Sequence, residues 1–337
     1  MPSSHLGLDL DQRLGLGLNR DSDSDSDSDS DRDSDRDSDS DRRIVAVKPI
    51  TVPAPGRSVD LQVKVTAPLS GHDLPVIVFS HGNAWSLDGY EPLVDRWAAA
   101  GFVVVQPTHL DSRRNGIGWD DPRFATIWRV RIADLHAVLD GLGDILARAG
   151  GLEARVDHER LAVVGHSWGA QTAGAILGAR VLDADGVPGE DFSHPAVSAG
   201  ALIAATGTGD TLTPFAAEHL PFMRPDYSTM TTPALVVAGG RDRSQLSTRG
   251  PEWFTDAYHL SPSPKSLLAI AEGEHTLGGL AGEMAAETTD EDPARVALVA
   301  DAISAYLRDA LKLDDAAWAA LNDSAEAGDG TWSIVGK

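Results

Sequence analysis

The sequence contains no cysteine among its 337 residues. Disulfide bonds, thiolate metal sites and a cysteine nucleophile are therefore excluded. Basic residues are also scarce, because 28 Lys and Arg stand against 51 Asp and Glu, for a formal net charge of −23. This balance argues against a nucleic-acid-binding protein, which neutralises phosphates with Lys and Arg. Long apolar runs are missing as well: no stretch approaches about 18 consecutive apolar residues, so we expect no transmembrane helix.

Residues 1–43 have a composition of their own, with 13 Asp and 6 Arg. Asp alternates with Ser over residues 21–41, with Arg32 and Arg36 interposed. Such a segment has no apolar side chains to offset the entropy of ordering, so we predict a disordered acidic tail over residues 1–43. Calcium binding by the spaced aspartates stays open as an alternative, although the repeat lacks the glycine of a compact calcium loop. The start also lacks the basic region and unbroken apolar segment of a secretory signal. We therefore expect a cytoplasmic protein, with another export route left open.

From Ile44 onward, short apolar runs alternate with helical stretches, which is typical of a parallel sheet covered on both faces. We predict an α/β domain over residues 44–313 with about eight strands in a mostly parallel sheet, and a C-terminal extension over residues 314–337. The expected strands are residues 44–52 and 59–67 as an antiparallel hairpin, then 76–79, 102–106, 161–164, 201–205, 234–238 and 267–270. The expected helices are residues 92–100, 122–146, 169–181 and 293–311. Nothing in the sequence predicts the oligomeric state or whether the extension packs on this domain or on a partner.

A nucleophile motif follows the strand LAVV. Residues 165–169 read Gly-His-Ser-Trp-Gly, which matches G-x-S-x-G, and a helical stretch follows directly. This strand–turn–helix setting is the one that the motif requires, because the sharp turn raises the serine hydroxyl above the end of the sheet. We therefore predict that Ser167 is a nucleophile.

A serine hydroxyl needs a base and an acid to become reactive, and in this kind of sheet they follow in the order Ser, Asp or Glu, His. Asp242 follows the strand ALVVAG, and His275 follows the last strand. Both are expected at the same edge as Ser167. Asp210 remains a competing acid because it also follows a strand. Among the other histidines, we expect structural roles for His81 and His136, and we expect His166 to point away from Ser167.

Acyl transfer also needs hydrogen-bond donors for the oxygen that becomes negative. We predict the backbone N–H groups of Trp168 and Asn83 as these donors. The Asn83 side chain has two open readings, a further contact or a helix cap. Trp85, Trp119 and Trp168 are predicted to line an apolar substrate pocket, since aromatic side chains near the catalytic edge usually line a ligand cleft. Core packing is the alternative for Trp119 and Trp128, and it is the interpretation that we favour for both.

Four segments together resemble a known superfamily. The runs PVIVFSHG, GFVVVQPTH, RIADLHAVLDGL and LAVVGHSWGA are similar to the α/β-hydrolases, over roughly Leu74 to Leu311. Within that superfamily they resemble the branch of platelet-activating-factor acetylhydrolases, chlorophyllase-like esterases and serine-type dienelactone hydrolases. The resemblance implies an eight-stranded, mostly parallel sheet and a triad of Ser167, Asp242 and His275, with oxyanion donors at Asn83 and Trp168. The chain departs from the many dienelactone hydrolases that use cysteine, and its bulky Asn83-Ala84-Trp85 segment prevents transfer of a substrate.

We therefore expect a serine esterase that cleaves a small-molecule ester through an acyl-serine intermediate, with no metal and no organic cofactor. Thioester, amide or polyester hydrolysis and cofactor-free perhydrolase or acyltransferase activity use the same triad and remain alternatives. A binding protein on the same fold is a third possibility, but such proteins usually lack one triad residue. Ser167 in the motif argues against an epoxide hydrolase or a dehalogenase, because these need an acidic nucleophile there.

Overall fold

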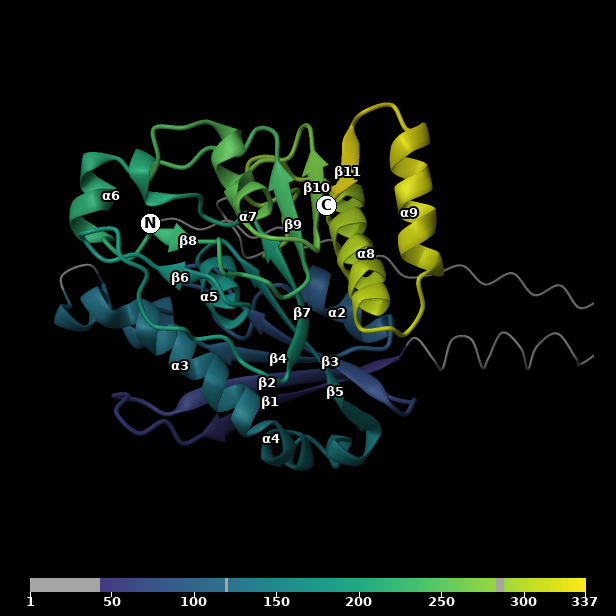
Figure 1. The fold of residues 1–337 in the computed structure, drawn as a ribbon. Helices are drawn as coiled ribbons and strands as arrows, with labels where there is room; N and C mark the ends of the chain where they lie inside the picture. The colour runs from purple at the N-terminus through teal and green to yellow at the C-terminus, as the bar shows by residue number, and fades with distance from the viewer. Residues whose placement is uncertain (1–42, 119–120, 283–287) are drawn as a thin grey trace, which may run out of the picture. The chain divides into compact units, whose positions relative to one another are not determined.

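The computed structural model of the chain describes residues 43–118, 121–282 and 288–337. These residues lie in the larger of two units, residues 39–337. Because the description begins at Arg43, the tail predicted to be disordered, residues 1–43, lies outside it apart from that residue. The centre of this unit is a nine-stranded sheet in the order β1-β2-β4-β3-β5-β7-β9-β10-β11 (Figure 1). Its strands are β1 (Ile44–Val52), β2 (Leu61–Pro68), β3 (Leu74–Ser80), β4 (Val103–Thr108), β5 (Val156–His166), β7 (Val197–Ile203), β9 (Ala234–Gly239), β10 (Lys265–Ile270) and β11 (Trp332–Gly336).

The six strands from β4 to β10 in this order run parallel, which confirms the prediction of a mostly parallel sheet. The pairs β1–β2, β2–β4 and β10–β11 are antiparallel, so the expected N-terminal hairpin is present. In the outermost strand, β1, the pairing register shifts between Val47 and Ile50, as at a β-bulge. A separate two-stranded sheet joins β6 (Arg180–Val181) to β8 (Pro225–Asp226).

Helices cover both faces of the sheet (Figure 1). They are α2 (Glu91–Ala99), α3 (Ile127–Asp140), α4 (Leu142–Arg148), α5 (Trp168–Ile176), α6 (Pro214–His219), α7 (Asp256–Leu260), α8 (Pro293–Ala310) and α9 (Ala316–Ala327). Val76 and Val78 of β3 pack into the apolar core under α3, α4 and α5. Ile77 and Phe79 pack into the core under α2 and α8. Because successive side chains of a strand point to opposite faces, two covered faces produce the continuous apolar strands of the sequence.

Two of the predicted helices differ from the observed ones. The stretch 122–146, predicted as one helix, divides into the 3-10 helix η2 (Pro122–Thr126), α3 and α4, with Gly141 at the break between α3 and α4. Glycine is a poor helix former, which explains the interruption. The helix predicted over 169–181 ends earlier, at Ile176, and Gly178 follows with φ of 107°. The remaining short helices are η1 (Arg113–Asn115), η3 (Leu152–Arg155), η4 (Gly209–Thr211) and η5 (Pro251–Thr255).

The ninth strand comes from residues that the sequence analysis assigned to the C-terminal extension. β11 pairs with β10 from Ser266↔Gly336 to Ile270↔Trp332. The preceding helix α9 lies beside α8 (Figure 1). Between the two helices, the Trp318 ring meets the Tyr306 ring edge-on, with centroids 5.2 Å apart. Residues 314–337 therefore contribute a helix and an edge strand to the same unit. Within the described residues, no helix has both the length and the apolar character needed to cross a membrane.

Candidate active site

A sharp turn joins β5 to α5 and carries Ser167. Its backbone angles, φ 57° and ψ −120°, are rare for a residue with a side chain. A Cβ atom at Gly165 would lie 2.0 Å from the carbonyl oxygen of Gly169, and one at Gly169 would lie 1.9 Å from the carbonyl oxygen of Ser80. Both positions therefore require glycine. The turn holds the Ser167 side chain at the carboxyl-terminal edge of the parallel strands.

The structure brings Ser167, His275 and Asp242 into hydrogen-bond contact. The Ser167 Oγ lies 2.9 Å from His275 Nε2, and His275 Nδ1 lies 2.9 Å from Asp242 Oδ2. Asp242 is fully buried, while the His275 side chain is 40% exposed. The competing acid, Asp210, accepts a hydrogen bond from the Thr208 hydroxyl instead. Of the two candidate acids, Asp242 therefore contacts His275.

His166 links three loops of the site, a role that the sequence analysis did not predict. Its Nε2–H donates to the carbonyl oxygen of His275 at 2.9 Å, and its Nδ1 accepts from the Tyr90 hydroxyl at 2.8 Å. The Tyr90 oxygen accepts in turn from the N–H of Gly82 at 3.1 Å. Burial, and then the nearby His275, lower the pKa of His166 to about 3, so the ring is neutral and keeps both roles.

The loop that carries His275 has a second anchor in Asp290. The Asp290 carboxylate accepts from the N–H of Glu274 at 2.8 Å and from the Thr276 hydroxyl at 3.1 Å. Arg295, in the first turn of α8, donates to the same carboxylate at 2.6 Å. The residues on both sides of His275 are therefore tied to α8, and this restricts the position of the imidazole.

The predicted oxyanion loop follows β3. Asn83 is half-buried, and its backbone N–H donates to no acceptor in the described part of the chain. The next residue, Ala84, has φ of 66°, and its N–H donates to Asp111 Oδ2 at 3.3 Å. The Ala84 carbonyl oxygen accepts from the N–H of Arg113 at 3.0 Å. The loop is thus fixed immediately after Asn83.

A buried arginine supports this loop from below. Arg131 of α3 donates from Nη1 to both Asp111 oxygens at 2.8 Å, and from Nη2 to the carbonyl oxygen of His81. The Arg131 and Asp111 side chains are each 1% exposed. Burial raises the pKa of Asp111, but the charge and hydrogen bonds of Arg131, together with the N–H of Ala84 and the nearby His81, lower it by more in total. The net shift of the Asp111 pKa is therefore downward, and Asp111 is ionised. The sequence analysis did not identify this ion pair.

Two histidines complete the buried network beneath the loop. His81 Nε2 accepts from the N–H of His109 at 3.0 Å, which agrees with the structural role expected for His81. His109 contacts the Asp134 carboxylate at 2.9 Å and the Ser80 hydroxyl at 2.8 Å. Burial, and then Arg131, lower the pKa of His81 to about 4 and hold that of His109 well below its ordinary value. Both rings are therefore neutral. The cations of this network are Arg131 and Arg57, whose side chain is buried and whose Nε lies 3.4 Å from Asp134 Oδ1.

The tryptophans considered for the substrate pocket do not all lie together in the described part of the structure. Trp85 is half-buried and packs edge-on against Tyr90 with ring centroids 5.8 Å apart. Trp119 lies outside the described residues. Trp168 packs against Phe222 at 5.7 Å. Trp128 also lies in this group, stacked on Phe222 at 6.4 Å.

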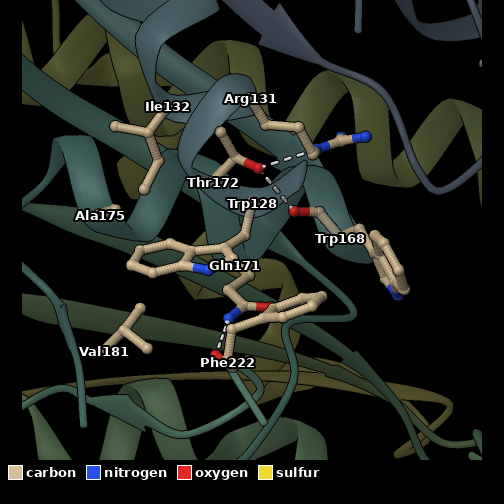
Figure 2. A pocket seen from close by; sticks show the side chains of 9 residues that line it. All are labelled: Trp128, Arg131, Ile132, Trp168, Gln171, Thr172, Ala175, Val181 and Phe222. Carbon is tan, nitrogen blue, oxygen red and sulfur yellow. Dashed lines mark hydrogen bonds between the residues drawn. The ribbon is translucent and has the colours of Figure 1, made fainter. Parts of the chain in front are cut away.

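Figure 2 shows a small cavity with Trp128, Trp168 and Phe222 in its wall, together with part of α5. Its volume of about 10 Å³ is room for roughly one water molecule. Trp128 therefore combines the expected packing role with a place in a cavity wall. Among the described residues, the lining includes neither Ser167 nor His275.

Comparison with known proteins gives one family. The chlorophyllase family matches residues 42–184, a range that includes the first strands, the predicted oxyanion loop, Arg131 and Ser167 but neither Asp242 nor His275. No curated protein matches the chain. Together with the mostly parallel sheet covered on both faces, this match identifies the chain as a protein with the α/β-hydrolase fold that is similar to the chlorophyllase family over residues 42–184.

Proposed function

We propose that the chain is a serine hydrolase that cleaves carboxylic esters of small molecules through an acyl-serine intermediate. The observation that carries this proposal is the contact series from Ser167 Oγ to His275 Nε2 at 2.9 Å and from His275 Nδ1 to Asp242 at 2.9 Å. A serine on a strained turn, a base within hydrogen-bond reach and a buried acid behind the base form the arrangement that activates a hydroxyl. The similarity to the chlorophyllase family across the turn supports an enzymatic role.

The first half of the reaction acylates Ser167. His275 Nε2 takes the hydroxyl proton while Ser167 Oγ attacks the ester carbonyl carbon, and the carbonyl electrons move onto the oxygen. Asp242 holds the imidazole in the required tautomer and stabilises its charged form. The backbone N–H groups of Trp168 and Asn83 are our proposed donors to the oxyanion, each worth about 10²–10³ in rate. Collapse of the intermediate expels the alcohol, which takes its proton from His275.

The second half of the reaction restores the serine. His275 removes a proton from water while the water oxygen attacks the acyl carbon. When the second tetrahedral intermediate collapses, Ser167 regains its proton from His275 and the carboxylic acid leaves. One water is consumed for each ester cleaved, and none of these steps calls for a cofactor.

The test is the intact-protein mass after treatment with a fluorophosphonate, a reagent that labels activated serines. We expect one adduct on the native chain, none on Ser167→Ala, and one on the control Ser324→Ala, whose serine lies on α9 and donates to the Ala320 carbonyl oxygen. An unlabelled native chain, or equal labelling of Ser167→Ala, would contradict the proposal.

The leaving group is tested separately with acetyl compounds that differ only in that group. We expect p-nitrophenyl acetate to be cleaved faster than the corresponding anilide, because an ester lacks amide resonance. The ester assignment also requires p-nitrophenyl acetate to be cleaved faster than the corresponding thioester. Faster cleavage of the thioester or anilide would replace the ester assignment and leave the proposed triad intact. Rapid transfer of the acyl group to added alcohol or peroxide would instead indicate an acyltransferase or a perhydrolase.

A further inference from the structure

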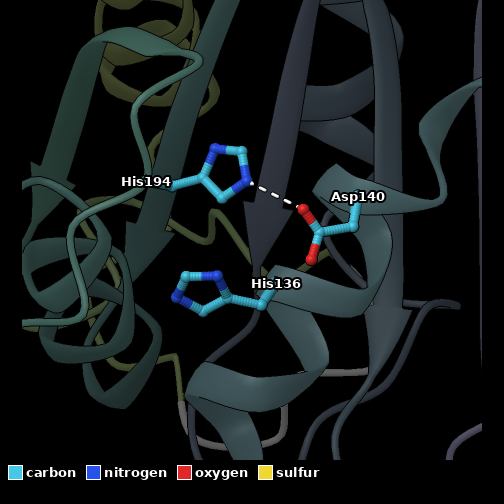
Figure 3. Close-up of side chains that lie close together, drawn as sticks. All are labelled: His136, Asp140 and His194. Carbon is cyan, nitrogen blue, oxygen red and sulfur yellow. Dashed lines mark hydrogen bonds and ion pairs between the residues drawn. The ribbon is translucent and has the colours of Figure 1, made fainter.

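A cluster of two histidines and one aspartate lies outside the candidate active site. His136 and Asp140 stand four positions apart in the last turns of α3, so they share one face of the helix. His194 comes from the loop between β6 and β7. Figure 3 shows the three side chains converging on one another. One potential ligand atom from each residue lies within 4.8 Å of the others.

We propose that His136, Asp140 and His194 bind one divalent transition-metal ion, with Zn²⁺ as the best fit. Two imidazoles and one carboxylate suit zinc, cobalt, nickel or copper, whereas magnesium and calcium prefer oxygen ligands alone. Three protein ligands leave a fourth tetrahedral position for water. No metal was expected from the sequence, since the expected triad chemistry requires none. Residues of α3 and of the distant loop come together only in the folded chain.

The hydrogen bonds of the cluster support this assignment. His136 Nε2 donates to the carbonyl oxygen of Phe192 at 3.1 Å. Donation from one ring nitrogen to a backbone carbonyl is the usual way in which a metal-binding histidine is oriented, and it leaves Nδ1 free to bind the ion. The backbone around His194 is fixed as well, because its N–H donates to the Ile176 carbonyl oxygen at 3.1 Å. The His194 ring has a contact of its own, because Nδ1 accepts from the N–H of Ala196 at 3.3 Å while Nε2 faces Asp140. The rings of both histidines are therefore already oriented.

The ion pair between His194 and Asp140 does not by itself explain why all three side chains lie together. His194 Nε2 lies 3.2 Å from Asp140 Oδ1, as in a simple His–Asp contact. That contact does not explain the His136 ring, whose centroid lies 5.4 Å from that of His194. The two acidic residues of the loop that precede His194 most closely, Glu190 and Asp191, are paired with Arg129 and Arg180. The carboxylate of Asp140 is thus the one placed toward both imidazoles, near the helix C-terminus, where a cation is favoured.

Binding requires only a small closure. Ligand atoms about 2.1 Å from a tetrahedral zinc ion are about 3.4 Å apart. Separations of up to 4.8 Å must therefore shrink by at most about 1.4 Å. The Asp140 side chain is 72% exposed and can rotate, while the His194 side chain is 11% exposed and stays in place. The bound ion would join α3 to the loop whose Phe192 ring meets Trp128 edge-on at 6.1 Å. It would therefore brace the wall of the aromatic cavity.

The experiment measures ZnCl₂ binding by calorimetry, and thermal unfolding with and without ZnCl₂, on the full chain without a histidine tag. We expect one equivalent of zinc to bind, and a zinc concentration of about 100 times Kd to raise the Tm by about 5 °C. His194→Ala and His136→Ala should lose both effects, and Asp140→Asn should weaken them. The control His72→Ala removes an exposed histidine outside the cluster and should behave like the native chain.

A second measurement guards against a variant that is merely unstable. Cobalt bound to the native chain should give the visible absorption of a four- or five-coordinate cobalt site. The His194→Ala variant should lack this absorption, while its Tm without metal should equal that of the native chain without metal. Absence of zinc binding by the native chain, or equal stoichiometric binding by His194→Ala and His136→Ala, would overturn the proposal. Neither measurement depends on hydrolytic activity.

Discussion

Replacement of Arg131 by methionine tests how the oxyanion loop is held. Methionine keeps much of the apolar stem but removes the guanidinium that contacts Asp111 and the His81 carbonyl oxygen. Arg131 also donates to the Thr172 hydroxyl at 3.1 Å. In the variant, the Asp111 carboxylate stays buried at 1% exposure and keeps the N–H of Ala84, 3.3 Å away, as a donor. A buried charge is then left without its counter-charge.

Removing one partner of a buried ion pair typically costs about 3–5 kcal/mol, because the remaining charge is desolvated and uncompensated. We expect a loss of this size in the free energy of unfolding, and a fall in Tm of about 10 °C. A matched control is Arg96→Met, since Arg96 makes a similar two-point contact with Asp301 at the surface, with side chains 46% and 55% exposed. That exposed pair should contribute less than about 1 kcal/mol.

The assay is urea unfolding at neutral pH, combined with turnover of an activated ester. In Arg131→Met we expect ester turnover to fall about 100-fold, the cost of displacing a positioned group by about 1 Å. The double variant Arg131→Met/Asp111→Leu should recover part of the stability, since it removes the unpaired carboxylate. If the free energy of unfolding of Arg131→Met differs from that of the native chain by less than about 1 kcal/mol, as expected for Arg96→Met, then other contacts hold the loop and the reasoning fails.

Three further predictions follow from the site. Gly169→Ala places a Cβ 1.9 Å from the Ser80 carbonyl oxygen, so we expect little folded protein in the soluble fraction, and a normal yield with native circular dichroism would refute the steric requirement. Asp242→Asn should leave the fold intact but lower kcat for an activated ester by about 10⁴, as loss of the orienting acid does in other triads; a fall of less than tenfold would show that His275 is oriented by something else. The folded pKa of His166 is about 3, below its unfolded value of 6.5, so the unfolded chain takes up the proton first and stability is lost as the pH falls below 6.5. Between pH 7 and pH 5, the free energy of unfolding measured in urea should therefore decrease by about 2 kcal/mol less for His166→Gln than for the native chain. An equal decrease in both proteins would mean that His166 is not the buried neutral group responsible.

The mostly parallel sheet and the contact between Ser167, His275 and Asp242 could be expected from the sequence for a simple physical reason. The carboxyl ends of parallel strands meet at one edge, so residues that follow β5, β9 and β10 must approach one another. A motif that needs a particular turn then selects among the polar residues at that edge. The catalytic roles of the three residues remain our proposal.

The Arg131 network could not be predicted in the same way, although the sequence holds a signal for it. Arg131 and Asp134 occupy positions of α3 on the same stripe as the buried Ile127, Leu135 and Val138. Charges on an apolar stripe indicate a buried ionic group, but their partners lie on other elements and depend on the fold. The strand β11 was missed because it has only five residues and follows a helix of mixed polarity.

The two edge strands of the sheet determine whether the sheets of two copies of this chain can pair edge to edge. An outer strand exposes a row of unpaired N–H and C=O groups that another chain can extend. The bulge in β1 contains Lys48 and Pro49, and proline has no N–H to donate, so this row is bent, charged and interrupted. The opposite edge is the five-residue β11, with Lys337 directly after it. Edge-to-edge pairing of two copies is therefore disfavoured at both edges of the sheet. Substitutions that remove the bulge of β1 would give a straight, unpaired edge strand, and we expect these to favour aggregation of the folded protein.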